Sequence, residues 1–413
     1  MTINVAAPRL SKEPPIFNRD PQAHVIGSDA EAIEAAKVLA EEFAAGAANR
    51  DRERILPAAE LDRFSESGLW GVTVPKAYGG AGVSFATLAE VIKLISAADP
   101  SIGQIPQNHL AALDAIRVTA SEEQKALWFG RVLKGYRLGN AFSEANSRHV
   151  GAFETTLTPD GDGYVVKGEK FYATGALFAH FIHIGAVAPD GKLRLAIVPR
   201  DAPGLTIVDN WSGFGQRTTA SGNVLIDNVR VGPEGVIPAY RGGEKPSSNG
   251  AVSQLIQAAV DAGIARGAID DTIAFVRKYT RPWIDSGQER GSDDVFTISQ
   301  IGDLKIKLHA AEALLEKAGL AIDGILDNPT DESVGVATVA VAQAKILTTE
   351  IAILAANKLH ELAGTRSTLA DFNLDRHWRN ARTHTLHDPV RWKYFHVGNH
   401  ALNGVNPPRH AWS

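Results

Sequence analysis

The pattern of apolar and polar positions divides the chain into three zones. In residues 1–138, apolar positions recur every three or four residues, which is the spacing of amphipathic helices. Ser28 and Glu31 have the spacing of a capping box, which predicts a helix that starts there and runs to about Ala45. The apolar run over residues 85–97 predicts another helix, which stops before a proline. This zone is therefore predicted to be an N-terminal helical domain.

In residues 139–240 the spacing changes to the alternation that indicates β-strands. Gly-rich turns at residues 160–163 and 189–192 lie between alternating segments, so they predict two hairpins. About six strands can be placed in this way. We expect a small antiparallel β domain here.

Residues 241–413 return to helical spacing. The segments 252–279, 298–326 and 333–363 are each two dozen residues or more. Long amphipathic helices in succession favour a four-helix bundle, and their many alanines suit close packing between subunits. The predicted fold is an α protein with a central β domain: an N-terminal helical domain, an antiparallel β domain and a C-terminal four-helix bundle.

Composition and charge narrow the class of protein. The 413 residues carry a net charge of −5, which gives no reason to expect nucleic acid or an anionic membrane as partner. The lack of cysteine excludes thiol nucleophiles, zinc–thiolate sites and Fe–S clusters. Asp261, Asp271 and Lys345 interrupt the longest apolar runs, so no membrane span is expected. The first ~25 residues, with Pro14 and Pro15, predict an extended arm without a signal-peptide pattern. We expect a cytoplasmic enzyme.

Titratable side chains gather in residues 376–388, next to the core-forming helices. This stretch holds three histidines, three arginines and Asp388. Burying so many polar groups is costly unless they bind something. A solvated helix end, whose cations suit the C-terminal dipole, has the same composition. On a continuous helix His384 and His387 would share one face, which makes them candidate site residues.

Six segments carry motifs specific enough to compare with known families. They are residues 69–82, 98–109, 170–175, 211–217, 281–283 and 379–389. Together the motifs resemble the acyl-CoA dehydrogenase superfamily, and within it the flavin-dependent monooxygenase branch that includes dibenzothiophene monooxygenase. They are most similar to the sulfur-acquisition oxidoreductase family called SfnB. The resemblance covers about residues 20 to 410, which is essentially the whole chain.

The last motif departs from the dehydrogenases at the catalytic base. Many dehydrogenases use a glutamate there to remove a proton next to a thioester carbonyl, but this stretch has no glutamate, and Asp388 is shorter and precedes Pro389. Loss of a general base costs roughly 10²–10⁴ in rate. The resemblance therefore implies a two-component monooxygenase, in which reduced FMN and O₂ form a C4a-hydroperoxyflavin that oxygenates a small organosulfur compound. The alternative is an FAD-dependent acyl-CoA dehydrogenase with a displaced catalytic base.

The resemblance also implies catalytic residues. His384 and His387 would face the flavin C4a edge, His109 would line the same cavity, and Thr174 would lie beside flavin N5. A histidine near its ordinary pKa can protonate or steady a peroxide, and water must be kept from that group. Taken alone, a histidine such as His109 is more often a hydrogen-bonded core residue than a site residue.

A flavin site follows from the same resemblance. The cofactor-binding residues that it implies are Asn140, Ser143, Thr174, Trp211, Arg281, Gly364 and Arg366. Trp211 would cover the ring, although it also suits a β-domain core. Arg281 would bind phosphate, although it also suits a plain surface position. Gly364 and Arg366 would come from a neighbouring subunit. The motifs leave FMN and FAD both open.

One missing motif bears on the electron source. No strand, Gly-x-Gly-x-x-Gly and helix unit for a nicotinamide cofactor is present, and residues 79–82 read as a turn. We therefore expect a separate NAD(P)H flavin reductase as partner, and a homotetramer built through the C-terminal bundle. Two rivals remain: a metal enzyme with His384, His387 and Asp388 as ligands, and a non-catalytic flavin-binding protein.

Overall fold

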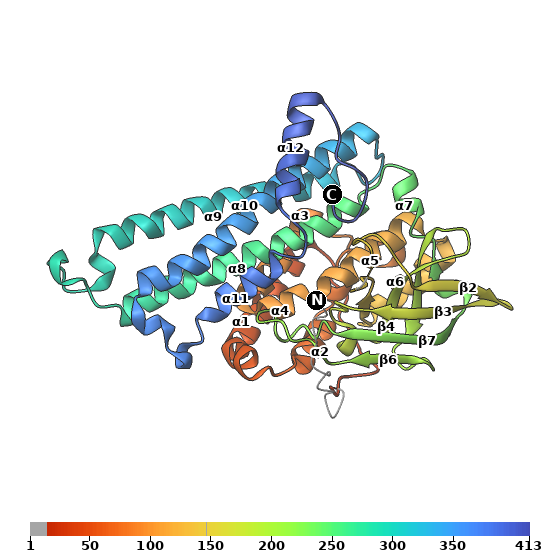
Figure 1. Cartoon of the computed structure of the whole chain (residues 1–413), viewed down its shortest axis with the longest axis horizontal. Helices are drawn as coiled ribbons and strands as arrows, with labels where there is room; N and C mark the ends of the chain where they lie inside the picture. Colours follow the sequence, from red (N-terminus) through yellow and green to blue (C-terminus); the bar gives the residue numbers. More distant parts are fainter. Residues whose placement is uncertain (1–14, 146) are drawn as a thin grey trace.

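The computed structural model describes residues 15–145 and 147–413. Helices of the first third pack against a β-sheet, and long helices of the last third extend beyond both (Figure 1). The order helical, β, helical is the one that the pattern predicts. The domain boundaries at 138 and 240 stay a prediction, as the first strand begins at Leu138 and the last ends at Ile237. Most of the expected N-terminal arm, Pro14 included, lies outside the described residues.

The N-terminal part is helical as predicted. Its helices are α1 (Asp29–Glu53), α2 (Ala58–Glu66), α3 (Phe85–Ala98), α4 (Pro100–Gln104), α5 (Pro106–Thr119) and α6 (Glu122–Leu133). Ser28 caps α1, because its hydroxyl accepts the Glu31 N–H at 3.2 Å. α1 continues past the predicted end at Ala45, since its buried stripe reaches Ala47 and Arg50.

The middle part forms one sheet in the order β6-β7-β3-β2-β4-β5-β8, with β1 paired to β4. The strands are β1 (Leu138–Ala141), β2 (Thr156–Asp160), β3 (Gly163–Lys170), β4 (Phe181–Val187), β5 (Leu193–Pro199), β6 (Leu205–Val208), β7 (Asn223–Val231) and β8 (Val236–Ile237). Both predicted hairpins are confirmed, as β2–β3 and β4–β5. Their turns place Gly161 and Gly191 at positive φ, which glycine adopts without strain.

The sheet is mixed, which corrects the antiparallel expectation. β1 runs parallel to β4, with Leu138 opposite Phe181. The chain leaves β1, makes the β2–β3 hairpin and crosses back, so β4 enters in the direction of β1. The short strands β1 and β8 were not predicted from the sequence. β1 is buried at all four positions and does not alternate, and β8 has only two residues.

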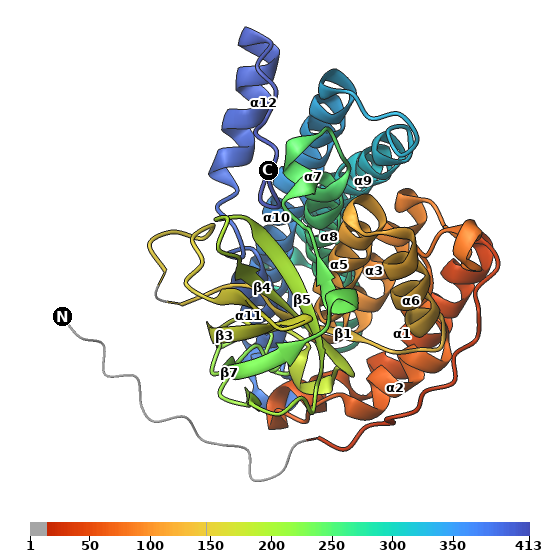
Figure 2. The same cartoon turned by 90° about the vertical axis from the view of Figure 1, so that its right-hand side faces the viewer.

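The C-terminal part is helical, and its three long helices match the predicted segments. Its helices are α7 (Arg241–Glu244), α8 (Asn249–Tyr279), α9 (Val295–Asp323), α10 (Asp331–Ala363), α11 (Asp375–His384) and α12 (Arg391–Asn403). α8 packs against α3, α9 and α10 and is the central helix. Among the described residues α10 alone is long and apolar enough to cross a membrane, but 67% of its most apolar window is buried inside the molecule. α12 projects from the body (Figure 2).

The predicted continuous helix through residue 387 is wrong. α11 ends at His384, and a turn follows in which the His387 N–H donates to the His384 carbonyl at 3.0 Å. Pro389 disfavours helical geometry at the residue before it, so the chain leaves the helix ahead of it. His384 and His387 are therefore brought together by a turn and not by one helix face.

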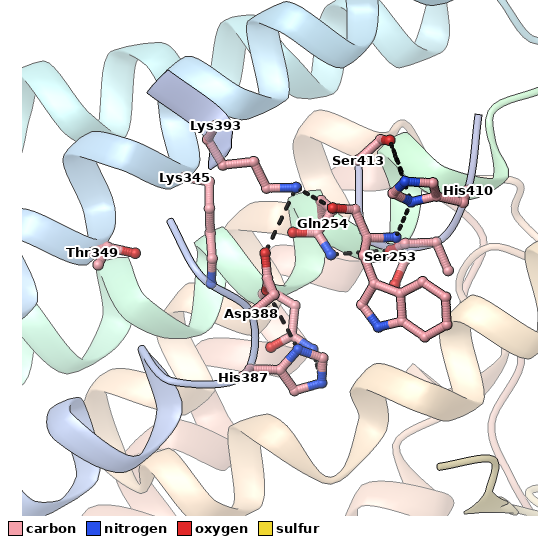
Figure 3. A network of polar contacts seen from close by, with 12 residues as sticks. Ser253, Gln254, Lys345, Thr349, His387, Asp388, Lys393, His410 and Ser413 are labelled. Carbon is pink, nitrogen blue, oxygen red and sulfur yellow. Dashed lines mark hydrogen bonds and ion pairs between the residues drawn. The ribbon is translucent and has the colours of Figure 1, made fainter. Parts of the chain in front are cut away.

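The chain after α12 returns to the body. Gly404 has a φ of +68°, which allows the reversal at the helix end. Lys393 Nζ donates to the Trp412 carbonyl at 2.6 Å, and Gln254 Nε2 donates to the Ala411 carbonyl at 3.0 Å. Figure 3 shows both side chains beside this returning segment. The segment thereby forms one wall of a space between the sheet and the helices.

Candidate functional site

A cavity of about 860 Å³ lies between the sheet, α5, the start of α8, the turn after α11 and residues 408–413. This volume suits a ligand the size of a cofactor together with a small substrate. Six of the residues singled out in the sequence line it: Asn140, Ser143, Thr174, Trp211, His384 and His387. They come from strands, loops and helices that are distant in the chain, so the fold assembles this group.

Strand β1 fixes Asn140 at the cavity. Its side-chain N–H₂ donates to the Tyr172 carbonyl at 3.0 Å, and its backbone N–H donates to the Thr174 carbonyl at 3.2 Å. Its Oδ1 is buried and has no partner among the described residues. Ser143 lies just beyond the strand, where its carbonyl accepts the Phe171 N–H at 2.9 Å. Asn140 thus keeps one acceptor for a ligand.

A chain of hydroxyl groups leads away from Thr174. Thr174 Oγ1 and Ser221 Oγ are 2.7 Å apart, as are Ser221 Oγ and Thr219 Oγ1. Thr219 donates to the Gln216 carbonyl at 3.0 Å. Since a carbonyl can only accept, Ser221 must donate to Thr219 and Thr174 to Ser221. Thr174 therefore offers lone pairs, and not a proton, to a ligand.

The loop of residues 211–217 carries Trp211 and Gln216 and is docked on α11. The Trp211 indole N–H donates to the Gln216 carbonyl at 2.9 Å, and the Gln216 N–H donates to Asn380 Oδ1 at 2.7 Å. Gly215 is required here, because a Cβ would lie 1.9 Å from the Arg379 carbonyl oxygen. Both polar atoms of the Gln216 side chain are buried without a partner among the described residues.

His384 is fully buried at the end of α11. Its Nδ1 lies 2.5 Å from Asp261 Oδ1 on α8. Asp261 Oδ2 accepts Lys345 Nζ and Thr349 Oγ1, each at 3.0 Å. The ring edge away from Asp261 carries Nε2, which has no partner among the described residues. His384 is thus held from one side and free on the other.

Charge fixes the ionisation of this pair. Burial alone would raise the pKa of Asp261, but Lys345 and His384 hold it at about 2. Burial lowers the pKa of His384 against the raising effect of Asp261, and Lys345 and His387 lower it further. The resting pair is a carboxylate and a neutral imidazole.

His387 has both ring nitrogens engaged. Its Nδ1 is 3.4 Å from Asp388 Oδ1, and its Nε2 is 3.1 Å from Gln257 Nε2. Its ring centroid is 6.5 Å from that of His384. Asp388 lies between His387 and Lys393 (Figure 3), 3.6 Å from Lys393 Nζ. Burial opposes this ionisation, but these neighbours hold the pKa of Asp388 below its usual range. The described residues contain no group of three that could hold a metal ion.

His109 does not line the cavity, contrary to expectation. It is buried in α5, with Nε2 at 2.9 Å from the Trp70 carbonyl, and Nδ1 accepting the Leu138 N–H at 3.0 Å. Burial lowers the pKa of His109 to about 3, so the ring is neutral at ordinary pH. His109 is therefore placed as a hydrogen-bonded core histidine, which is the second interpretation that the sequence allowed.

The phosphate and neighbour residues lie elsewhere. Arg281, Gly364 and Arg366 are absent from the cavity lining. Arg281 follows the far end of α8, whose 31 residues span about 45 Å from the end that lines the cavity. Arg366 lies over the Tyr279 ring at 4.8 Å, so it belongs to the same far end. One chain cannot bring these residues to its own cavity.

Sequence reasoning missed Gln216, Gln257 and Asp261. Gln216 stands inside the motif of residues 211–217, but nothing in that motif marks its side chain as unpaired. Asp261 left a signal, since it interrupts an apolar helical run. A carboxylate in such a place must have a buried partner, and here it has Lys345 and His384.

Family models place the chain among known proteins. Models of the N-terminal, middle and C-terminal domains of acyl-CoA dehydrogenases match residues 30–136, 141–229 and 255–392. The chain belongs to the acyl-CoA dehydrogenase family. It is 34% identical to dibenzothiophene monooxygenase of Rhodococcus qingshengii, over 92% of this chain and 95% of that protein. The predicted branch is therefore confirmed.

Two further similarities concern flavin. The chain is 30% identical to a probable FMNH₂-dependent monooxygenase, SfnC, of Pseudomonas putida, over 91% of this chain and 96% of that protein. The crystal structure of FMN-bound TdsC from Paenibacillus sp. A11-2 matches with a TM-score of 0.88 and 33% identity, over 92% of this chain and 100% of that one. A solved structure that shares the fold over most of this chain thus contains FMN.

Proposed function

We propose that this chain is a flavin-dependent monooxygenase that uses reduced FMN and O₂ to oxygenate a small organosulfur compound. The observation that carries the proposal is the assembly of six predicted site residues around one cavity. Residues of its wall hold buried polar atoms that have no partner in the part of the chain that the structure describes. The similarity to a dibenzothiophene monooxygenase and to an FMNH₂-dependent monooxygenase supports the chemistry.

The residues at the cavity fit a flavin. Its wall combines aromatic side chains, such as Tyr172 and Trp211, with buried polar atoms that lack partners within residues 15–145 and 147–413: Asn140 Oδ1, Thr383 Oγ1 and both side-chain polar atoms of Gln216. Leaving such atoms unpaired costs roughly 1–3 kcal/mol each. A flat heteroaromatic ring with donors and acceptors along its edges would pair them. FMN is favoured over FAD by the FMN-bound relative.

When bound, reduced FMN supplies the two electrons with which O₂ gives one oxygen atom to the substrate and the other to water. The chain's own residues do the rest. Asn140, Ser143 and Thr174 hold the ring edge, and Trp211 covers it. His384 and His387 hold or move a proton at their ring nitrogens. The segment of residues 408–413 keeps water from the cavity.

The phosphate of the flavin is bound across a subunit interface. Arg281, Gly364 and Arg366 reach the cavity of a neighbouring copy, since they cannot reach their own. Exposed apolar side chains beside Arg281 support an interface there: Trp283 is 72% and Ile284 is 85% exposed. The assembly is a homotetramer, and a monomeric mass by light scattering at micromolar concentration would contradict it.

Electrons come from a separate NAD(P)H flavin reductase, and the enzyme works in the cytoplasm. The alternative, an acyl-CoA dehydrogenase with a displaced base, gains no support from Asp388. That carboxylate is buried between His387 and Lys393 and does not line the cavity.

The test is incubation with chemically reduced FMN, O₂ and a panel of sulfides, sulfones and thiophenes, dibenzothiophene included, with product masses recorded. We expect a product heavier by one oxygen atom, labelled when ¹⁸O₂ is used. Anaerobic reduction of bound flavin by an acyl-CoA, with no oxygenated product from the panel, would contradict the proposal.

A further inference from the structure

Two Asp–His pairs join α8 to α11, and one of them borders the cavity. Asp271 pairs with His377, and ten residues earlier on α8 Asp261 pairs with His384. His377 does not line the cavity, whereas His384 does. The second pair therefore combines a buried carboxylate with an imidazole of a cavity-lining residue, whose Nε2 is buried in the wall without a partner among the described residues.

The two oxygens of Asp261 have different partners. Oδ2 accepts from Lys345 and Thr349, while Oδ1 faces His384 Nδ1. The carboxylate has no exposed surface. An ionised carboxylate can only accept hydrogen bonds, so His384 Nδ1 must carry the proton. In a neutral imidazole the other nitrogen, Nε2, then has a lone pair and no hydrogen.

We propose that Asp261, held as an anion by Lys345 and Thr349, is a positioning residue that makes His384 Nε2 a hydrogen-bond acceptor at the cavity. This rests on the proposed function in one respect, since the donor that Nε2 meets is an N–H or O–H of the reduced flavin or the substrate. Thr174 offers lone pairs in the same way. The site thus presents fixed acceptors to a donor.

The charged groups around His384 agree with this tautomer. Asp261 from α8, Lys345 from α10 and His387 from the turn face it, with Asp388 and Lys393 behind His387. With His384 neutral, Lys345 balances Asp261, and Lys393 lies 3.6 Å from Asp388. Burial and Lys345 lower the pKa of His384 more than Asp261 raises it, so the ring does not take a second proton at neutral pH.

The variant Asp261→Asn reverses the polarity of Nε2. Lys345 and Thr349 are both donors, so they attract the amide oxygen of the asparagine to the position of Oδ2. The amide N–H₂ then faces His384 Nδ1 and donates to it. The imidazole must move its proton to Nε2, which becomes a donor.

Neutron diffraction from crystals grown in D₂O tests the tautomer directly and needs no substrate. We expect a deuteron on His384 Nδ1 and none on Nε2 in the natural protein, and the reverse in Asp261→Asn. A deuteron on Nε2 of the natural protein overturns the proposal, even if the variant does not fold. This result is independent of whether the enzyme oxygenates sulfur, so failure of the proposed function would be recognised separately.

Kinetics separate a positioning role from a structural one. In Asp261→Asn, product formed per O₂ consumed should fall by about 10²-fold or more, because the atom at the site has the wrong polarity. Adding Asp261→Asn to His384→Ala should cause no further loss, since Asp261 acts through His384. Asp271→Asn removes the same kind of carboxylate from α8 and should leave the ratio unchanged. Additive losses in the double variant would overturn the proposal.

Discussion

The two Asp–His pairs between α8 and α11 are alike in chemistry and differ in what they leave free. At the far pair, Asp271 Oδ2 contacts both Arg376 Nη2 at 2.6 Å and His377 Nε2 at 2.7 Å, and its side chain is 38% exposed. At the near pair, Asp261 has no exposure and His384 offers its Nδ1 instead. Only the near pair borders the cavity. An Asp–His pair alone therefore does not indicate a functional site. What distinguishes His384 is that one ring nitrogen has no partner among the described residues and that the residue lines the cavity.

The same lesson applies to the dense charged stretch at residues 376–388. Most of its charges stabilise the fold, since Arg376 pairs with Asp271 and Arg379 pairs with Asp51 at 2.6 Å. Asp388 is likewise held by Lys393. Largely buried ion pairs, and not a solvated helix end, thus account for Arg376, Arg379 and Asp388. Of the charged and titratable residues in this stretch, His384 and His387 line the cavity.

The largest effect should come from breaking the near pair and sparing the far one. His384→Ala should lower product per O₂ by roughly 10²–10⁴-fold and raise H₂O₂ release, with reduced FMN still bound. His377→Ala should lower the folding stability, because the contact with Asp271 is lost, but product formed per O₂ consumed should equal that of the natural protein. Oxygen-electrode and product measurements on both variants decide the matter. If the two variants uncouple equally, the comparison is wrong.

His387 sharpens the comparison, because both its nitrogens are engaged and it still lines the cavity. His387→Ala should lower product per O₂ by ~10²-fold while flavin binding and reaction with O₂ persist. It lies in a turn, so alanine should leave the fold intact. If product formed per O₂ consumed is the same in His387→Ala, His384→Ala and the natural protein, the catalytic assignment of this stretch is contradicted.

Arg281 extends the comparison to the far end of α8. If it binds phosphate, Arg281→Ala should weaken binding of reduced FMN by roughly 10–150-fold. The matched control is Arg277→Ala, an exposed arginine one turn earlier on α8. Equilibrium titration under anaerobic conditions measures both. Equal affinities in Arg281→Ala and the natural protein would remove the assignment.

The smallest effect concerns His109, a buried histidine with neither nitrogen free. Its folded pKa of about 3 lies below the ordinary 6.5, so below pH 6.5 the unfolded chain binds a proton that the folded chain does not. Folding stability is thus lost as pH falls from 6.5 towards 3. Between pH 7 and pH 5 this residue should account for about 2 kcal/mol of the loss. Urea unfolding of His109→Gln should show that much less pH dependence; an unchanged dependence would refute it.

Local patterns predicted much of the fold, and distant pairings were beyond them. The cap at Ser28, both hairpins and the three long helices follow from residues a few positions apart. The parallel pairing of β1 with β4 depends on a crossover that no local pattern encodes. Pro389 indicates that α11 ends before Asp388, but it does not place the end at His384.

Sequence motifs identified the candidate site residues that lie inside them and missed those that lie outside. Thr174 and His384 stand in recognisable segments. Asp261 meets His384 across 123 positions of sequence, a pairing set by how α8 packs on α11. Arg281 does not line the cavity of its own chain, so its proposed contact with phosphate depends on a second copy, whose position one sequence does not give.

The length of α8 has a consequence for complementation between mutant alleles. One end of the helix lines its own cavity. In the assembly that we propose, the other end, with Arg281, reaches the cavity of a neighbouring subunit. In a mixed pair, a subunit with Arg281→Ala and a subunit with His384→Ala leave one site with both residues intact and concentrate both defects in the other. Two alleles that are each defective alone should therefore complement each other when they are expressed together, whereas two alleles of the cavity end should not.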